Sequence, residues 1–248
     1  MRLTVIGCAG SFPGPDSPAS CYLIEHDGFH LVLDLGNGAL GVLQRHVALT
    51  DIDAVVLSHL HADHCLDLCG LYVAQRYHPE GPRAPIPVWG PSGTAPRMAR
   101  AYDLAEEPGM SGQFDFRDLV AGEHRIGPFV VTAARVNHPV EAYGLRVEAG
   151  GHSVAYSGDT AECTALIELA RDADVAVFEA SCLESQPAPG VHLTARQAAQ
   201  HAQDAGVSTL VLTHLVAWND PQATLAEARP AFDGEILLAT SGLVIDMA

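Results

Sequence analysis

The feature that most constrains this chain is an apolar run that passes directly into four side chains able to bind a metal ion. Residues 54–57 read Ala-Val-Val-Leu, and His59, His61, Asp63 and His64 follow at once. In extended backbone His59 and His61 point to the same side, so they can grip one ion together. The other two then fall at the turn into a following helix, offset toward a second ion. The run therefore predicts a metal site at the end of a buried strand.

Three more candidate ligands lie far from this run in the sequence. His138, Asp159 and His214 each follow a separate apolar run rich in β-branched residues. Residues at the strand ends of a layered α/β protein converge on a common rim, so distant side chains can meet there. We therefore expect seven metal ligands to gather at one edge of the fold.

Alternating short apolar runs and helix-like stretches predict one α/β domain spanning 1–248. The predicted strands are 20–25, 30–34, 54–58, 129–135, 153–157, 175–179 and 209–213. The predicted helices are 66–76, 160–172 and 194–205, the last opened by a capping box of Thr194 and Gln197. Residues 79–96, which contain six prolines, predict an irregular surface loop carrying one short strand, 86–89.

The order and spacing of the seven candidate ligands resemble the metal-binding signature of the metallo-β-lactamase superfamily, and the match runs through nearly the whole chain. The resemblance implies a four-layer αββα sandwich holding two zinc ions. Manganese or iron remains open, because nitrogen and oxygen ligands suit them too. The implied division places His59, His61 and His138 on the first metal, Asp63, His64 and His214 on the second, and Asp159 between them.

The implied chemistry is hydrolysis by a water made acidic by two adjacent dications. In related enzymes a residue in the place of Asp63 orients the attacking group and takes its proton, so the resemblance gives Asp63 a catalytic role besides its role as a ligand. Antibiotic-hydrolysing members commonly differ at the bridging position, and some use cysteine on the second metal. The aspartate at position 159 instead favours the phosphodiesterase, glyoxalase and lactonase branches.

A second resemblance concerns two segments after the ligands. Phe178-Glu179-Ala180-Ser181 and His192-Leu193-Thr194 are similar to segments of ribonuclease Z and its phosphodiesterase relatives. There, a histidine in the place of His192, backed by a carboxylate in the place of Glu179, is implicated in protonating the leaving oxygen. A carboxylate raises the pKa of a histidine that it holds, which suits a proton donor. The alternative is a buried hydrogen-bonded pair that only ties a loop to the core.

Charge argues against a long nucleic acid as the substrate. The chain has 13 basic residues, all arginine, against 30 acidic ones, and its net charge is −17. Nucleic-acid binding normally uses a basic surface that neutralises phosphates. The long arm by which ribonuclease Z holds transfer RNA has no room here, because His138, Asp159 and Glu179 are only 21 and 20 positions apart.

We therefore expect a phosphodiesterase acting on cyclic or other small nucleotides. The segments 7–20 and 59–79 are similar to an actinobacterial subgroup that includes a cyclic-nucleotide phosphodiesterase. Three alternatives stay open: a ribonuclease Z-like nuclease, a lactone or thioester hydrolase, and a metal-binding sensor without turnover. Scattered cysteines without a C-x-x-C motif and the lack of a long apolar run predict a reduced, cytoplasmic protein with no membrane segment. A homodimer is expected by analogy alone.

A few other residues attract attention without a firm assignment. Gly10-Ser11 would suit a phosphate through backbone N–H groups, but a tight turn after the first strand explains glycine better. Cys65 follows a ligand and lies one helical turn from Cys69, where packed thiols are a simpler interpretation than a redox pair. Trp218 and the pair Tyr77-His78 would either edge a substrate pocket or cover the core.

Overall fold

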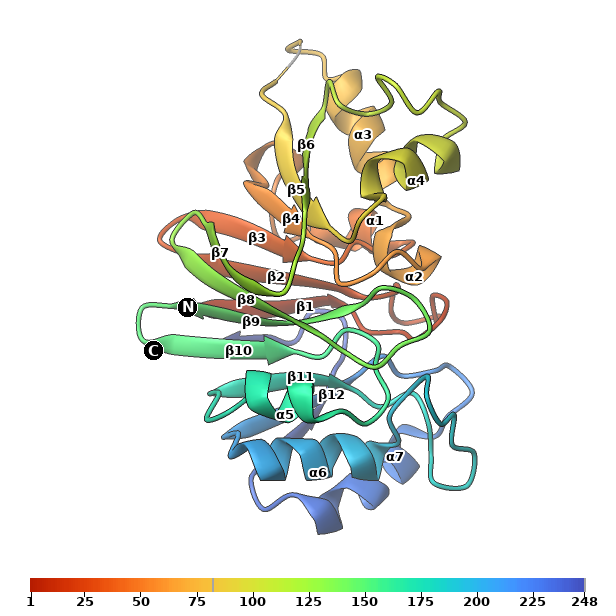
Figure 1. Cartoon of the computed structure of the whole chain (residues 1–248), viewed down its shortest axis with the longest axis vertical. Coiled ribbons are helices and arrows are strands. Elements are labelled where there is room, and N and C mark those ends of the chain that lie inside the picture. The colour runs from red at the N-terminus through yellow and green to blue at the C-terminus, as the bar shows by residue number, and fades with distance from the viewer. Residues whose placement is uncertain (82, 248) are drawn as a thin grey trace.

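Two seven-stranded β-sheets lie face to face at the centre of the molecule (Figure 1). The computed structural model describes residues 1–81 and 83–247. The first sheet has the order β14 (Val244–Asp246), β1 (Arg2–Gly7), β2 (Cys21–His26), β3 (Phe29–Leu33), β4 (Ala54–Val56), β5 (Ile86–Gly90) and β6 (Phe114–Asp118). The second has the order β13 (Glu235–Leu238), β12 (Thr209–Thr213), β11 (Val175–Glu179), β10 (His152–Tyr156), β9 (Tyr143–Ala149), β8 (Phe129–Arg135) and β7 (Gly122–Ile126).

Helices form the two outer layers. One layer contains α1 (Ala39–Leu43), α2 (Ala62–Cys65), α3 (Leu68–Arg76) and α4 (Thr94–Ala101), in the upper half of Figure 1. The other contains α5 (Thr164–Leu169), α6 (Ala195–Ala205) and α7 (Pro221–Ala228), at the bottom. This is the predicted four-layer αββα sandwich.

Apolar side chains fill each of the three interfaces between layers, as a layered fold requires. The central core lies between the sheets and contains Leu33, Val56, Phe129 and Tyr156. A second core packs the first sheet against its helices through residues such as Leu57 and Leu68, and a third packs the second sheet against α5 to α7.

Strand direction brings the candidate ligands to one edge. In the first sheet β3, β4, β5 and β6 are parallel, and in the second β10, β11, β12 and β13 are parallel. Strands β8 and β10 are both antiparallel to β9, so these two also run the same way. The loops after β4, β8, β10 and β12 each carry one or more of the predicted ligands.

The predicted strands and the helix 194–205 agree with the structure to within two residues, and Thr194 forms the predicted capping box. The helix predicted over 160–172 is wrong at both ends, since only Thr164–Leu169 is helical. Thr160 instead donates its backbone N–H to the buried Glu179 Oε1 at 2.8 Å. The helix predicted from 66 starts at Leu68, because Leu66 still ends α2.

Within 79–96 the predicted strand is present as β5, but α4 already begins at Thr94, and Pro82 lies outside the described residues. None of the helices in the described ranges has the length and apolar character needed to cross a bilayer. All six cysteines are free thiols.

Candidate metal centre and active site

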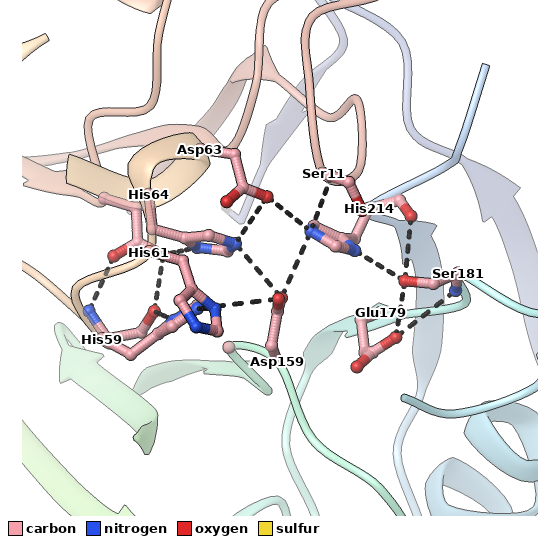
Figure 2. Close-up of polar contacts among 12 residues, drawn as sticks. Ser11, His59, His61, Asp63, His64, Asp159, Glu179, Ser181 and His214 are labelled. Carbon is pink, nitrogen blue, oxygen red and sulfur yellow. Dashed lines mark hydrogen bonds and ion pairs between the residues drawn. The ribbon is translucent and has the colours of Figure 1, made fainter. Parts of the chain in front are cut away.

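The seven predicted ligands meet in two adjoining clusters, most of which Figure 2 shows. In the first cluster His61 Nδ1 lies 3.1 Å from His59 Nε2 and 3.3 Å from His138 Nε2. In the second, His214 Nε2 lies 3.2 Å from Asp63 Oδ2, and His64 Nε2 lies 3.5 Å from the same oxygen. The ligand atoms within each cluster, Asp159 included, lie within 4.8 Å of one another.

Asp159 joins the two clusters. Its Oδ2 lies 3.6 Å from His59 Nε2, and its Oδ1 lies 3.2 Å from His64 Nε2 and 3.4 Å from His214 Nε2. Figure 2 shows the carboxylate between the two groups of imidazoles. Because β10 ends just before Asp159, this strand places the carboxylate where the loops of both sheets meet. One oxygen toward each cluster is the arrangement that a bridging ligand needs.

Two of the clustered ligand atoms lack hydrogen bonds within the described part of the chain, which a bound cation would replace. His64 Nε2 and Asp159 Oδ1 are buried and have no hydrogen-bond partner among the described residues. Buried polar atoms are normally paired, and an unpaired one costs about 1–3 kcal/mol. Nitrogen and carboxylate oxygen in groups of four are ligands that suit zinc. The residues present therefore fit the two-metal centre that the sequence predicts.

Hydrogen bonds on the outer side of the histidines set which nitrogen faces the clusters. Asp34, fully buried, accepts from His64 Nδ1 at 2.7 Å, from Ser58 Oγ at 2.7 Å and from Tyr156 Oη at 2.7 Å. Ser58 Oγ, donating to Asp34, accepts in turn from His59 Nδ1 at 3.1 Å. A proton on each Nδ1 leaves the Nε2 lone pair free for a metal, the usual role of such outer partners.

Glu179 orients a histidine of the second cluster through a similar chain of hydrogen bonds. Its Oε2 accepts from Ser181 Oγ at 2.8 Å, and Ser181 Oγ accepts from His214 Nδ1 at 2.6 Å. His138 Nδ1 donates to the carbonyl oxygen of Val191 at 3.0 Å. Two buried carboxylates, Asp34 and Glu179, thus orient ligands of both clusters through short chains of hydrogen bonds.

Electrostatics within the clusters follows from burial and from neighbouring charges. Burial and the neighbouring imidazole of His64 hold the pKa of His59 well below its usual value, so that ring stays neutral and able to bind a metal. Burial would also lower the pKa of His64, but the carboxylates of Asp159 and Asp34 raise it well above the usual value. The cluster therefore attracts positive charge, which a dication would supply.

The predicted pair of Glu179 and His192 is present beside the second cluster. His192 Nδ1 donates to Glu179 Oε1 at 2.9 Å. Burial lowers the pKa of His192, but the hydrogen bond and charge of Glu179, with Asp159 and Asp63, outweigh burial and raise it to about 9. With Nδ1 engaged, Nε2 is the atom left to hold a transferable proton.

Glu179, His192 and His214 also approach closely enough to suggest a third metal group. Their atoms are already engaged, however. Both oxygens of Glu179 accept hydrogen bonds, and His214 Nδ1 is bonded to Ser181 Oγ. We therefore interpret the group as a hydrogen-bonded cluster that orients His192 and His214, not as a third metal site.

Sequence reasoning missed the supporting residues Asp34, Ser58, Ser181 and Tyr156. The only signal for Asp34 was its position after an apolar run, which also describes ordinary turn residues. Its backbone lies in the left-handed region, at φ 56°. Its partners are 24, 30 and 122 positions away in the chain, so sequence spacing could not indicate them.

Close backbone approach explains two of the glycines near the centre. A Cβ on Gly36 would lie 2.0 Å from the carbonyl oxygen of Asp63, and one on Gly10 would lie 2.5 Å from that of His214. Ser11 donates its backbone N–H to His214 Nε2 at 3.3 Å. Cys65 is buried in the core between the first sheet and its helices, and its Sγ donates to the carbonyl oxygen of His61 at 3.2 Å, in keeping with a packed thiol.

Asp34→Asn is expected to weaken zinc binding by about 10- to 100-fold, the usual cost of losing an outer partner of a metal ligand. Asparagine tolerates the left-handed backbone but cannot accept three hydrogen bonds on one anionic oxygen. Zinc affinity, measured by competition with a chelator, checks this. Asp27→Asn is the control, because Asp27 has a similar φ of 49° but an exposed side chain. Equal affinity in the two variants would contradict the orienting role of Asp34.

Comparison with known proteins agrees with the family resemblance that the order of the candidate ligands indicates. A family model described as "Beta-lactamase superfamily domain" matches residues 31–215. The uncharacterized protein ML1173 of Mycobacterium leprae is 44% identical over 100% of this chain and 89% of its own length. The probable metallo-hydrolase YhfI of Bacillus subtilis is 32% identical over 98% of this chain and 99% of its own length.

The crystal structure of YhfI, described as a metallo-β-lactamase fold protein, superposes with a TM-score of 0.89 at 28% identity and covers 98% of both chains. A ribonuclease Z of Haloarcula marismortui is 29% identical, covering 98% of this chain and 96% of its own. That alignment extends over 300 positions although this chain has 248 residues, so the ribonuclease carries inserted segments that this chain lacks.

Proposed function

The chain belongs to the β-lactamase superfamily of metallo-hydrolases, and from this premise we propose that it is a binuclear phosphodiesterase acting on cyclic or other small nucleotides. The observation that carries the proposal is the joining of two ligand clusters by Asp159, with the pair of His192 and Glu179 beside them. The clusters supply a place for the reacting phosphate, and the pair supplies a proton donor.

When bound, two dications would lower the pKa of water and neutralise charge that develops on the phosphate. His59, His61 and His138 would hold one ion and Asp63, His64 and His214 the other, with Asp159 between them. Zinc is the proposed metal.

The residues of the chain complete the proton transfers. As the water oxygen forms its bond to phosphorus, its proton passes to Asp63, whose Oδ1 has no hydrogen-bond partner among the described residues. As the bond from phosphorus to the leaving oxygen breaks, His192 Nε2 gives that oxygen a proton. Glu179 remains hydrogen-bonded to His192 Nδ1 and stabilises the ring while it carries the proton.

Two observations support a small diester over a long nucleic acid. The net charge of −17 with no lysine gives a polynucleotide little to bind. The connections around the centre are also short: only residues 136–142 join β8 to β9, and 157–163 join β10 to α5. Similarity to a protein named ribonuclease Z supports phosphodiester chemistry. This chain lacks the inserted segments of that ribonuclease, which weighs against an RNA substrate here.

The purified protein loaded with zinc or manganese is expected to hydrolyse bis-p-nitrophenyl phosphate and cyclic AMP. It should leave a transfer-RNA precursor and an acyl-lactone largely intact. Elemental analysis should find two metal ions per chain. Faster turnover of the precursor would favour the ribonuclease Z-like alternative, and faster turnover of the lactone the carbonyl hydrolase. Two bound metals with no activity on any diester would reject the proposal and favour a sensor.

A further inference from the structure

A pocket of about 210 Å³ adjoins the second cluster on the side of His214. His192 lines it together with Ser11 and Ser181, which also contact His214. Figure 2 shows both serines beside that histidine. The rest of the lining comes from Cys182, Leu183, Gln186, Val216, Trp218 and Asn219. Pockets for whole drug-sized ligands have about 300–1,000 Å³, so this one suits a single part of a substrate.

Trp218, which lines this pocket, forms an aromatic pair with Phe12. Trp218 is 70% exposed, and its ring centroid lies 5.3 Å from that of Phe12, which is 39% exposed. The pair joins segments about 200 residues apart, one after β1 and one after β12. Asn219 holds its loop in place, because its Nδ2 donates to the carbonyl oxygen of Ser181 at 2.8 Å. The loop thus presents an indole from a fixed position with most of its surface uncovered.

The lining contains no aspartate, glutamate, lysine or arginine. Apart from the imidazole of His192, a second phosphate or a carboxylate would find no cation there, in a chain whose net charge is already −17. An uncharged flat ring matches the lining better, since an indole stacks on any π-face regardless of ring identity. The exposed amide of Gln186 offers a donor and an acceptor to the edge of such a ring.

We propose that this pocket binds the nucleobase of the substrate and that Trp218, supported by Phe12, stacks on the base. The inference rests on the proposed diesterase function for its orientation: the phosphate lies at Asp159 and the base beside His192. Trp218 is then a specificity-determining residue, which favours nucleotides over simple sugar or alkyl phosphates of the same charge.

The two tryptophans allow a binding test that needs no turnover. Trp89 is 7% exposed, whereas Trp218 is largely exposed, so a base stacked on Trp218 should quench mainly that residue's fluorescence. Titration of the zinc-loaded full chain with adenosine 5′-monophosphate should quench saturably, and ribose 5-phosphate should not. The quench should disappear in Trp218→Phe, which retains only Trp89. An equal quench by both phosphates, or a quench that persists in this variant, would overturn the proposal.

Competition against bis-p-nitrophenyl phosphate gives the second readout. Adenosine 5′-monophosphate should inhibit on the order of tenfold more tightly than ribose 5-phosphate, and Trp218→Ala should remove that difference. Trp218→Phe should keep much of it, because phenylalanine still stacks. Tyr77→Ala is the matched control, since Tyr77 is also 70% exposed but lies at the end of α3. A preference that survives in Trp218→Ala would refute the stacking.

The two proposals can fail separately. Diester hydrolysis with no quench and no preference for the base would overturn the base pocket and leave the phosphodiesterase standing. A quench that depends on Trp218 in a protein without diesterase activity would support the pocket and reject the proposed catalysis.

Discussion

Asp159→Asn is expected to lower kcat/KM on bis-p-nitrophenyl phosphate by on the order of 10³-fold and to reduce the metal content below two ions per chain. Asparagine has nearly the same shape but offers only one oxygen and no charge. It would therefore lose contact with one cluster, because the two carboxylate oxygens of Asp159 face different clusters. The negative charge that would hold two cations close together would also be lost.

Activity and elemental analysis of the same preparation check this expectation, since both should fall together. Asp174→Asn is the matched control, because Asp174 precedes β11 at the opposite end of the same sheet and accepts from the backbone N–H of Ser153 at 2.7 Å. It should keep two metals and full activity. If Asp159→Asn did the same, the bridging role would be refuted.

The grouping of the seven candidate ligands could be predicted from the sequence, because each follows a strand that its own apolar residues reveal. His138 and His214 come just after β8 and β12, and Asp159 just after β10. Once the strands are predicted, their ends are expected to meet at one edge of a layered fold, and the loop conformations need not be known. The division into two clusters needed the resemblance to a family as well.

The supporting residues could not be predicted in the same way. Ser181 is an ordinary serine until β11 and β12 place it between Glu179 and His214. The strand β7 was missed for a related reason, because its glutamate, histidine and arginine lie mostly exposed at the edge of its sheet and give no apolar signal. Sequence patterns report burial against a core, whereas these features depend on partners far away in the chain.

His192→Ala is expected to slow hydrolysis of diesters with alkoxide leaving groups by about 10²- to 10⁴-fold, the usual contribution of a general acid. Esters of p-nitrophenolate should slow much less, because that leaving group departs without a proton. Comparing kcat for cyclic AMP and for bis-p-nitrophenyl phosphate in the variant and in the unaltered protein measures the difference. Equal losses on both substrates, accompanied by a lower Tm, would instead support a purely structural pair of His192 and Glu179.

The pH dependence provides an independent check on the same role. An acid must be protonated to act, so turnover of cyclic AMP should fall about tenfold per pH unit above the pKa of His192. Glu179, Asp159 and Asp63 together raise that pKa to about 9, and cations held by the two aspartates would offset their contributions. The alkaline limb is therefore expected at or below pH 9.

Glu179→Gln should move this limb to lower pH, toward the usual histidine value of about 6.5. A limb at the same pH in that variant would mean that the group losing its proton is not a histidine held by Glu179.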